Sequence, residues 1–348
     1  MKRSDFIKSV SLLTVAAAAG KSFAISENNT EEKVIFPPAL KIGDTIGIIS
    51  PAGVLKEGQS EKSIKNLEDL GFIVVQGENV NSVNGYFAGS DKDRANDVNK
   101  MFANSDVKGI FCTRGGYGAV RILDFLDYQT IKKNPKVLVG YSDITSLQYG
   151  IFKETGLVTF HGPVGISTFN EFSVNALNGV VINNGEDFLI KADLSQADDP
   201  EFEAYTVVPG KAEGRLVGGN LSVVASLIGT KHDINYKNKI VYLEEIGEEP
   251  YSIDRMLTQM LYSGKFEEAN GVALGIFKDS TPDEKKSGIS NSFTLKEVIL
   301  DRLSNLKIPV YYGFSFGHIL NKYTVPFGVK AELNASEGYL KLLERAVI

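Results

Sequence analysis

A serine stands where a predicted strand gives way to a helix. The β-forming run at residues 136–140 ends in a glycine, Ser142 follows, and from Ile144 onward apolar residues recur at helical spacing. At such a place the free backbone N–H groups and the positive end of the helix dipole stabilise an oxyanion. A hydroxyl there acts as a nucleophile when a base reaches it. The alternative is that Ser142 only caps the helix, since serine is a preferred N-cap residue.

The chain has three histidines that could serve as the base. His232 follows a polar, turn-like Gly-Thr-Lys segment and is most simply a surface residue. His161 and His318 each follow an apolar strand segment and adjoin a glycine, so either could take the proton of Ser142 or be a structural histidine. The spacing alone does not choose between them.

Glu244 is the candidate for an acid that orients the base. It is the first charged residue after the apolar run at residues 240–243, at the carboxyl end of a predicted strand. A carboxylate there would fix the tautomer of a histidine and stabilise its charged form. The alternative is a solvated acidic loop that Glu244 shares with Glu245, Glu248 and Glu249.

A glycine-rich turn, Arg-Gly-Gly-Tyr-Gly at residues 114–118, lies between a predicted strand and a predicted helix. Turns of this kind let backbone amides approach an anion. The segment contains neither GxGxxG nor a following Lys-Ser/Thr, so a phosphate loop is the weaker interpretation. An amide donor close to Ser142 would suit the same geometry.

Composition excludes several other classes of protein and site. The chain has 348 residues and a formal charge of −6, which removal of residues 1–24 would shift to −9, so we expect a poor nucleic-acid binder. Cys112 is the only cysteine, which rules out an internal disulfide and a cysteine-based zinc site. Its apolar neighbours favour an inert core thiol. No HExxH or similar spacing occurs, and we expect no metal or other cofactor.

The amino terminus resembles an export signal. Lys2, Arg3 and Lys8 precede an apolar run at residues 10–20, and small residues follow at 22–24. The run is too short to span a bilayer. We therefore expect residues 1–24 to be an export signal and the mature protein to be periplasmic; the alternatives are a cytoplasmic protein or one tethered to the membrane by an uncleaved signal.

The order of predicted elements gives an α/β fold. Predicted strands at 45–49, 72–75, 107–113 and 136–140 alternate with helices at 60–70, 91–103 and 117–126. This alternation predicts a mostly parallel sheet covered on both faces, with its working loops at the carboxyl ends of the strands. A second such unit has strands at 239–244, 271–277 and 309–314, helices at 252–266 and 294–306, and two short strands near Val329 and Leu340.

The length favours two domains. We expect a leader at 25–38, a nucleophile domain at 39–165, a less regular connecting segment at 166–210, and a C-terminal domain at 211–348 that supplies Glu and His.

Five motifs together closely resemble the LD-carboxypeptidase family of serine peptidases, in order from about residue 40 to the C-terminus. They are Arg-Gly-Gly-Tyr-Gly at 114–118, Gly-Tyr-Ser-Asp-Ile-Thr at 140–145, Gly-Gly-Asn-Leu at 218–221, Leu-Glu-Glu-Ile-Gly-Glu-Glu-Pro-Tyr at 243–251 with Asp-Arg-Met-Leu at 254–257, and Gly-Phe-Ser-Phe-Gly-His at 313–318.

The resemblance implies roles that spacing leaves open. It implies that Ser142 is the nucleophile, that Glu244 is the acid and that His318, not His161, is the base. It implies oxyanion donors at the amide of Asp143 and in the Gly115–Gly116 turn. On this basis the oxyanion and substrate-binding residues are Gly116, Asp143, Arg114 and Asn220.

The resemblance also implies a flavodoxin-like parallel-sheet N-terminal domain, a mixed α/β C-terminal domain and a homodimer. Members of that family cleave L,D peptide bonds, typically the one before the terminal D-Ala of murein tetrapeptides. Some relatives hydrolyse microcin-type peptide-nucleotide antibiotics. We therefore expect a serine LD-carboxypeptidase acting on murein peptides. An exported solute-binding protein is the alternative from another class, but it needs no serine-histidine pair.

Overall fold

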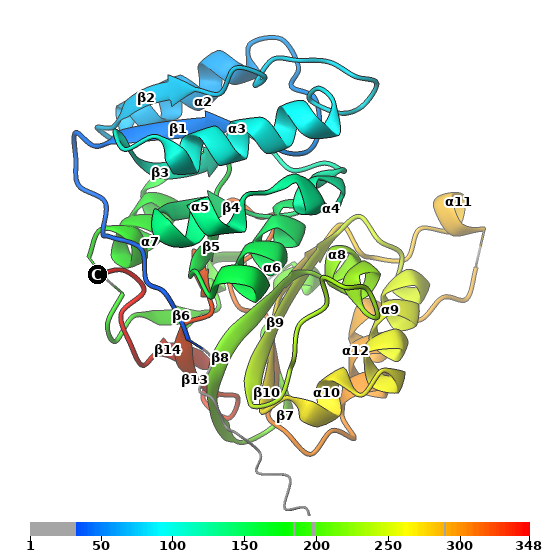
Figure 1. Ribbon diagram of the computed structural model, residues 1–348. Helices are drawn as coiled ribbons and strands as arrows, with labels where there is room; N and C mark the ends of the chain where they lie inside the picture. The colour runs from blue at the N-terminus through cyan, green and yellow to red at the C-terminus, as the bar shows by residue number, and fades with distance from the viewer. Residues whose placement is uncertain (1–32, 184, 197–198, 289) are drawn as a thin grey trace, which may run out of the picture. The chain divides into compact units, whose positions relative to one another are not determined.

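The computed structural model describes residues 33–348 except 184, 197–198 and 289 (Figure 1). The predicted export signal and residues 25–32 of the predicted leader lie outside the described residues. Residues Val34–Ile348 form one compact unit that contains two sheets. Within the described residues, no helix is both long and apolar enough to cross a membrane.

The first sheet has six strands in the order β12-β5-β4-β3-β1-β2. Five of them are parallel: β1 (Thr45–Ile49), β2 (Ile73–Gln76), β3 (Val107–Cys112), β4 (Val137–Gly140) and β5 (Thr159–His161). Their order, 2-1-3-4-5, is the flavodoxin-like one. The sixth strand, β12 (Val325–Phe327), pairs antiparallel with β5 although it comes from near the end of the chain.

Helices on the first sheet begin and end where local sequence requires it. They are α2 (Gln59–Asp69), α3 (Asp91–Ala103), α4 (Ala119–Ile122), α5 (Tyr128–Lys133), α6 (Ile144–Thr155) and α7 (Glu171–Val181), with the 3-10 turn η1 (Leu123–Phe125) after α4. Ser90 and Asp93 form a capping box at the start of α3. Helix α6 ends at Gly156 in the left-handed conformation. Ten of its twelve residues are buried, so α6 lies inside the protein rather than on its surface.

The second sheet has eight strands in the order β6-β14-β13-β8-β9-β10-β11-β7. Its strands are β6 (Leu189–Lys191), β7 (Tyr205–Val208), β8 (Lys211–Asn220), β9 (Lys239–Ile246), β10 (Gly271–Lys278), β11 (Val310–Tyr312), β13 (Lys330–Asn334) and β14 (Tyr339–Leu342). The central four, β8 to β11, are parallel, and the flanking strands pair antiparallel. Its helices are α8 (Leu221–Leu227), α9 (Pro250–Tyr262), α10 (Lys265–Glu268), α11 (Glu284–Ser287) and α12 (Leu295–Leu303).

The end of β8 packs tightly against two neighbours. A side chain at Gly218 would place its Cβ 1.8 Å from the carbonyl oxygen of Tyr242 on β9, and one at Gly219 would come 2.4 Å from Thr145 Oγ1 on α6. The next residue, Asn220, donates its backbone N–H to the same Thr145 oxygen at 3.1 Å. Two successive glycines therefore allow α6 of the first sheet to lie directly on β8 of the second.

The predicted α/β class, with a mostly parallel first sheet and a mixed second one, is confirmed. Three local predictions of secondary structure differ from the structure. Residues 117–126 form the short α4 and the 3-10 turn η1, and the helix predicted at 252–266 is broken at Gly264, which adopts a left-handed φ of 75°. The connection predicted to be irregular at 166–210 contains α7, β6 and β7. The predicted domain boundaries stay a prediction.

The tight packing of β8 makes a measurable claim about Gly218. We expect Gly218→Ala to lower the free energy of unfolding by about 3 kcal/mol or more, since backbone atoms cannot move aside for the new Cβ. Gly229→Ala is the matched control: its φ is also positive, 79°, but no atom lies within 4 Å of the added Cβ, so the loss should be about 1 kcal/mol. Urea denaturation measures both, and equal losses would contradict the proposed packing constraint.

Candidate active site

Ser142 occupies a sharp turn between β4 and α6, as the sequence predicts. Its φ is +65°, a left-handed conformation that costs a non-glycine residue about 1–3 kcal/mol. The helix begins at Ile144 with Asp143 as its N-cap, so the interpretation of Ser142 as a simple capping residue is wrong. A Cβ on the preceding Gly140 would lie 2.8 Å from the Ile144 side chain, which explains why the turn starts from glycine.

The glycine-rich turn after β3 lies directly over Ser142. A Cβ on Gly115 would sit 2.8 Å from Ser142 Cβ, 2.9 Å from its Oγ and 3.3 Å from the backbone nitrogen of Asp143. The turn is held in place because Arg114 Nη1 donates to the Val54 carbonyl at 2.9 Å and the Gly53 N–H donates to the Gly115 carbonyl at 3.2 Å. The predicted proximity of the turn to Ser142 is therefore present in the structure.

The carboxylate of Asp143 is used within the fold. It is buried and accepts the backbone N–H of Ala119 at 2.8 Å, which ties the start of α6 to the start of α4. Burial raises the pKa of Asp143 to about 6, against the opposing effects of the Ala119 N–H and of Arg94. Its backbone N–H, not its carboxylate, is the group that lies next to Ser142.

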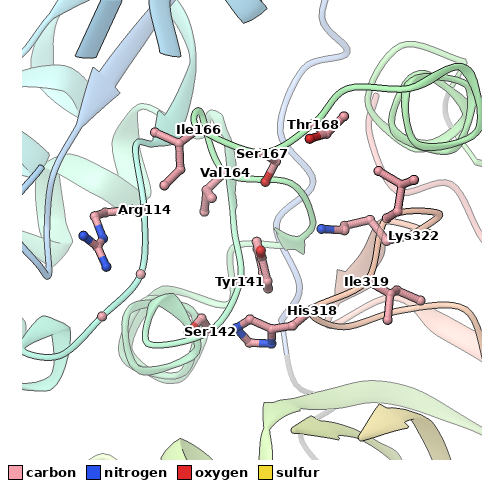
Figure 2. Close-up of a pocket in the computed structure, with 13 residues that line it drawn as sticks. Arg114, Tyr141, Ser142, Val164, Ile166, Ser167, Thr168, His318, Ile319 and Lys322 are labelled. Carbon is pink, nitrogen blue, oxygen red and sulfur yellow. The ribbon is translucent and has the colours of Figure 1, made fainter. Parts of the chain in front are cut away.

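Glu244 and His318 form a short hydrogen bond. Nδ1 of His318 lies 2.7 Å from Oε2 of Glu244, which is fully buried at the end of β9. Burial acts to raise the pKa of Glu244, but the charge and hydrogen bond of His318, together with His161 and Asn220, hold the pKa below its usual value. Because the carboxylate accepts from Nδ1, the other ring nitrogen is left for the pocket, where Figure 2 shows the imidazole beside Ser142.

A glycine also permits this pair. Gly317 has a φ of +121°, and a Cβ there would lie 3.0 Å from both Cβ and Oε2 of Glu244. The loop that carries His318 therefore passes directly over the carboxylate. Glycine is the residue that tolerates both the backbone angle and the contact.

Asn220 and Glu245 lie behind the pair. The side chain of Asn220 donates to Glu245 Oε1 at 2.9 Å and accepts the Val223 N–H at 3.3 Å, capping α8. Glu245 also accepts from the N–H and hydroxyl of Ser222, each at 2.7 Å. Asn220 is buried and is not among the described residues that line the pocket, so this geometry supports a structural role for it rather than the predicted substrate contact. The interpretation of Glu244 and Glu245 as part of a solvated acidic loop is also wrong, since both side chains are buried.

His161 lies on β5 behind Glu244. Its Nε2 is 3.6 Å from Glu244 Oε1, and neither ring nitrogen has a hydrogen-bond partner among the described residues. Burial lowers the pKa of His161 to about 4, with Glu244 opposing and the charges of His318 and Lys322 adding to the decrease. At neutral pH it is an uncharged, buried histidine. Of the two candidates that spacing left open, His318 shares a pocket with Ser142 and His161 does not.

Ser142, His318 and the glycine-rich turn line a pocket of about 470 Å³ (Figure 2). It is lined by Arg114, Gly115, Gly116, Tyr141, Ser142, Val164, Ile166, Ser167, Thr168, His318, Ile319, Leu320 and Lys322. Tyr141, Ser167 and Lys322 were not predicted as site residues. Tyr141 lies within the motif at 140–145 and Lys322 follows the motif at 313–318 by four residues, so proximity to the motifs is the signal that could have found these two. Ser167 has no such signal.

Family models match most of the described chain. Residues 46–162 match the LD-carboxypeptidase N-terminal domain and residues 213–333 match the LD-carboxypeptidase C-terminal domain. A probable murein peptide carboxypeptidase of Bacillus subtilis is 37% identical over 86% of this chain and 92% of its own length. The microcin C7 self-immunity protein of Escherichia coli is 28% identical over 88% and 95%. A solved muramoyltetrapeptide carboxypeptidase from Oxalobacter formigenes superposes with a TM-score of 0.72 at 30% identity, covering 86% of this chain and 97% of that one.

The buried His161 predicts how stability depends on pH. In the unfolded chain it takes up a proton as the pH falls through about 6.5, while in the folded protein it does so only near 4. Folding stability is therefore lost between these values as the pH falls, by up to about 3 kcal/mol.

His161→Gln lacks this titration, and we expect its free energy of unfolding to fall less than that of the wild type between pH 6.5 and pH 4. Urea denaturation at both pH values gives the comparison. Parallel losses in the two proteins would show that His161 is not buried in its neutral form.

Proposed function

The chain belongs to the LD-carboxypeptidase family of serine peptidases, and we propose that it hydrolyses the L,D peptide bond before the terminal D-Ala of murein tetrapeptides with Ser142, His318 and Glu244 as its catalytic triad. The observation that carries the proposal is the 2.7 Å contact between His318 and the buried Glu244, on a histidine that shares a pocket with Ser142. A carboxylate behind a histidine that faces a hydroxyl is the arrangement that acyl transfer requires.

The proposed reaction has two halves. His318 Nε2 takes the proton of Ser142 Oγ while the oxygen attacks the scissile carbonyl carbon, and Glu244 stabilises the imidazolium that forms. His318 then gives that proton to the amine of the leaving D-Ala, and the shortened peptide stays on Ser142 as an ester. A water molecule, deprotonated by His318, attacks the ester carbonyl. The bond to Ser142 Oγ then breaks, His318 returns the proton to that oxygen, and the shortened peptide leaves with a new carboxylate.

Backbone amides supply the oxyanion site in this proposal. The N–H groups of Asp143 and Gly116 belong to the two segments that meet at Ser142, the start of α6 and the glycine-rich turn. Fixed amides of this kind stabilise the negative charge that develops on the carbonyl oxygen. The left-handed φ of Ser142 supports the same mechanism, since a strained turn between strand and helix exposes the nucleophile's Oγ at the end of the sheet.

The similarity to the microcin immunity protein supports a second candidate substrate, a peptide-nucleotide antibiotic, at the same site. The two differ in what leaves: a free D-amino acid from murein peptides, or a nucleotide-linked group from the antibiotic. Assaying both substrates in parallel separates them. The homodimer implied by the resemblance stays a prediction.

We expect Ser142→Ala and His318→Ala to lower kcat/KM on a murein tetrapeptide by roughly four to six orders of magnitude without unfolding the protein, since each removes a reacting group. Glu244→Ala should cost less, because that residue orients the base and does not itself react with substrate. Mass spectrometry of the products measures turnover and circular dichroism checks folding.

His161→Gln is the matched control and should retain turnover within about tenfold of the wild type, because His161 does not line the pocket. A severe loss of turnover in His161→Gln, with near-normal turnover in His318→Ala, would show that the base is His161 and not His318. Intact tetrapeptide with the wild-type protein would instead favour a binding protein.

We further propose that residues 1–24 are removed on export and that the mature enzyme acts in the periplasm. The cationic start, the short apolar run and the small residues at 22–24 support this. N-terminal sequencing of the native protein from fractionated cells should give a start near residue 25. A start at Met1 in the cytoplasmic fraction would refute export, and a start at Met1 in the membrane fraction would indicate a tether.

A further inference from the structure

One buried cation in the pocket has no counter-ion in the described part of the chain. Lys322 is only 6% exposed, and its Nζ lies 4.7 Å from the centre of the Tyr141 ring. Among the residues that the structure describes, no carboxylate lies within ion-pair distance of this Nζ and none accepts a hydrogen bond from it. Burial lowers the pKa of Lys322 to about 8, with the charge of Glu244 opposing. A desolvated ammonium whose close contact is an aromatic ring is a group that an anionic ligand would complete.

The position of Lys322 is fixed by the fold. Its backbone N–H donates to Ser173 Oγ on α7 at 3.2 Å, and the same hydroxyl donates to the Leu320 carbonyl at 2.9 Å. The next residue, Tyr323, donates its N–H to the Ser315 carbonyl at 2.7 Å. The loop after His318 is therefore anchored around Lys322, which fixes the backbone from which this side chain extends into the pocket.

A second polar group faces the same place. Ser167 is 8% exposed and lines the pocket, and its hydroxyl lies next to Tyr141. Figure 2 shows the ammonium end of Lys322 pointing toward Ser167 and Tyr141. An ammonium and a hydroxyl that converge in this way suit the two oxygens of a carboxylate.

Lys322 shares a neighbour, Tyr141, with the proposed base His318. The Tyr141 ring contacts both residues, with its centre 4.6 Å from the centre of the His318 ring and 4.7 Å from Lys322 Nζ. Arg114 lies on the opposite side of Ser142 in Figure 2. His318 must give its proton to the amine of the departing residue, whose α-carboxylate is separated from that nitrogen by one carbon. We therefore expect that carboxylate to lie toward the cation that packs on the same aromatic ring as His318.

We propose that Lys322 and the hydroxyl of Ser167 bind the terminal α-carboxylate of the residue that is released, and so restrict cleavage to the last peptide bond. This inference rests on the proposed function, because it requires a peptide whose C-terminal residue leaves from the His318 side. Arg114 is the other cation of the pocket, but it lies beside the oxyanion turn, where its Nη1 donates to Val54.

The test combines a change in the enzyme with a change in the substrate. The substrates are a murein tetrapeptide with a free C-terminal carboxylate and the same peptide with a C-terminal amide. The enzymes are the wild type, Lys322→Met, Lys322→Arg, and Lys65→Met as a control for loss of a lysine, since Lys65 is a surface residue paired with Asp69.

For the wild type and Lys65→Met, we expect amidation of the substrate to lower kcat/KM about 100-fold. In Lys322→Met, the acid should lose about the same factor while the amide changes less than about threefold, so that the enzyme no longer distinguishes the two peptides. Lys322→Arg should restore part of the preference for the acid.

Three outcomes would overturn the inference. If Lys322→Met keeps the wild-type ratio between acid and amide, Lys322 does not bind the carboxylate, whatever its effect on turnover. If the wild type cleaves both peptides equally, the pocket does not read the carboxylate and the proposed function survives alone. If the wild type cleaves neither peptide, the proposed function fails, and this inference fails with it.

Discussion

The geometry of the site depends on how closely the end of β8 approaches the first turn of α6. Gly219 leaves room for the Thr145 side chain, and the N–H of Asn220 donates to the Thr145 hydroxyl. Ser142 stands immediately before that turn, and Glu244 is the register partner of Asn220 on the neighbouring strand β9. The contact between the backbone at Gly219–Asn220 and the Thr145 side chain thus sets the separation between Ser142 and Glu244. Any side chain at Gly219 would change that separation.

Glu244 lies between two imidazoles that differ in their surroundings. His318 hydrogen-bonds to one carboxylate oxygen and opens onto the pocket. His161 is fully buried, and its Nε2 lies 3.6 Å from the other carboxylate oxygen. Its desolvation keeps it neutral. The carboxylate is therefore hydrogen-bonded to the imidazole that opens onto the pocket and not to the one that is fully buried. A positive charge on His161 would be costly, because burial removes the imidazole from water.

The parts of the site that the sequence could predict are those that local pattern controls. The strand, glycine and helical spacing around Ser142 correctly indicated a sharp turn, and the apolar run before Glu244 correctly placed it at the end of a strand. The choice between His161 and His318 could not come from spacing, because each follows an apolar segment beside a glycine and the difference lies in which one faces the pocket. The resemblance to a family, not the pattern, favoured His318.

Other elements were missed for identifiable reasons. Helix α7 has a good N-cap in Asn170, but its mix of polar residues with Gly179 weakened the helical pattern. Strand β12 is three residues long and contains Pro326, which argues against a strand unless it lies at the edge of a sheet, as it does here. Lys322 escaped attention because its burial is a product of tertiary packing, and a lysine in a polar sequence is normally expected on the surface.

Strand β12 also bears on how such a protein could be divided or inherited. The segment from His318 to Lys322 leaves β11 in the second sheet and continues into β12, which completes the edge of the first sheet against β5. The first sheet is thus not encoded by a continuous stretch of the gene, since its last strand lies more than 160 residues after the strand it pairs with. A recombination event that exchanged the N-terminal half alone would join one β5 to a foreign β12. Because a strand from the C-terminal half completes the sheet of the N-terminal half, we expect the two halves to be inherited together. Changes at β5 and in the segment after His318 are then selected together.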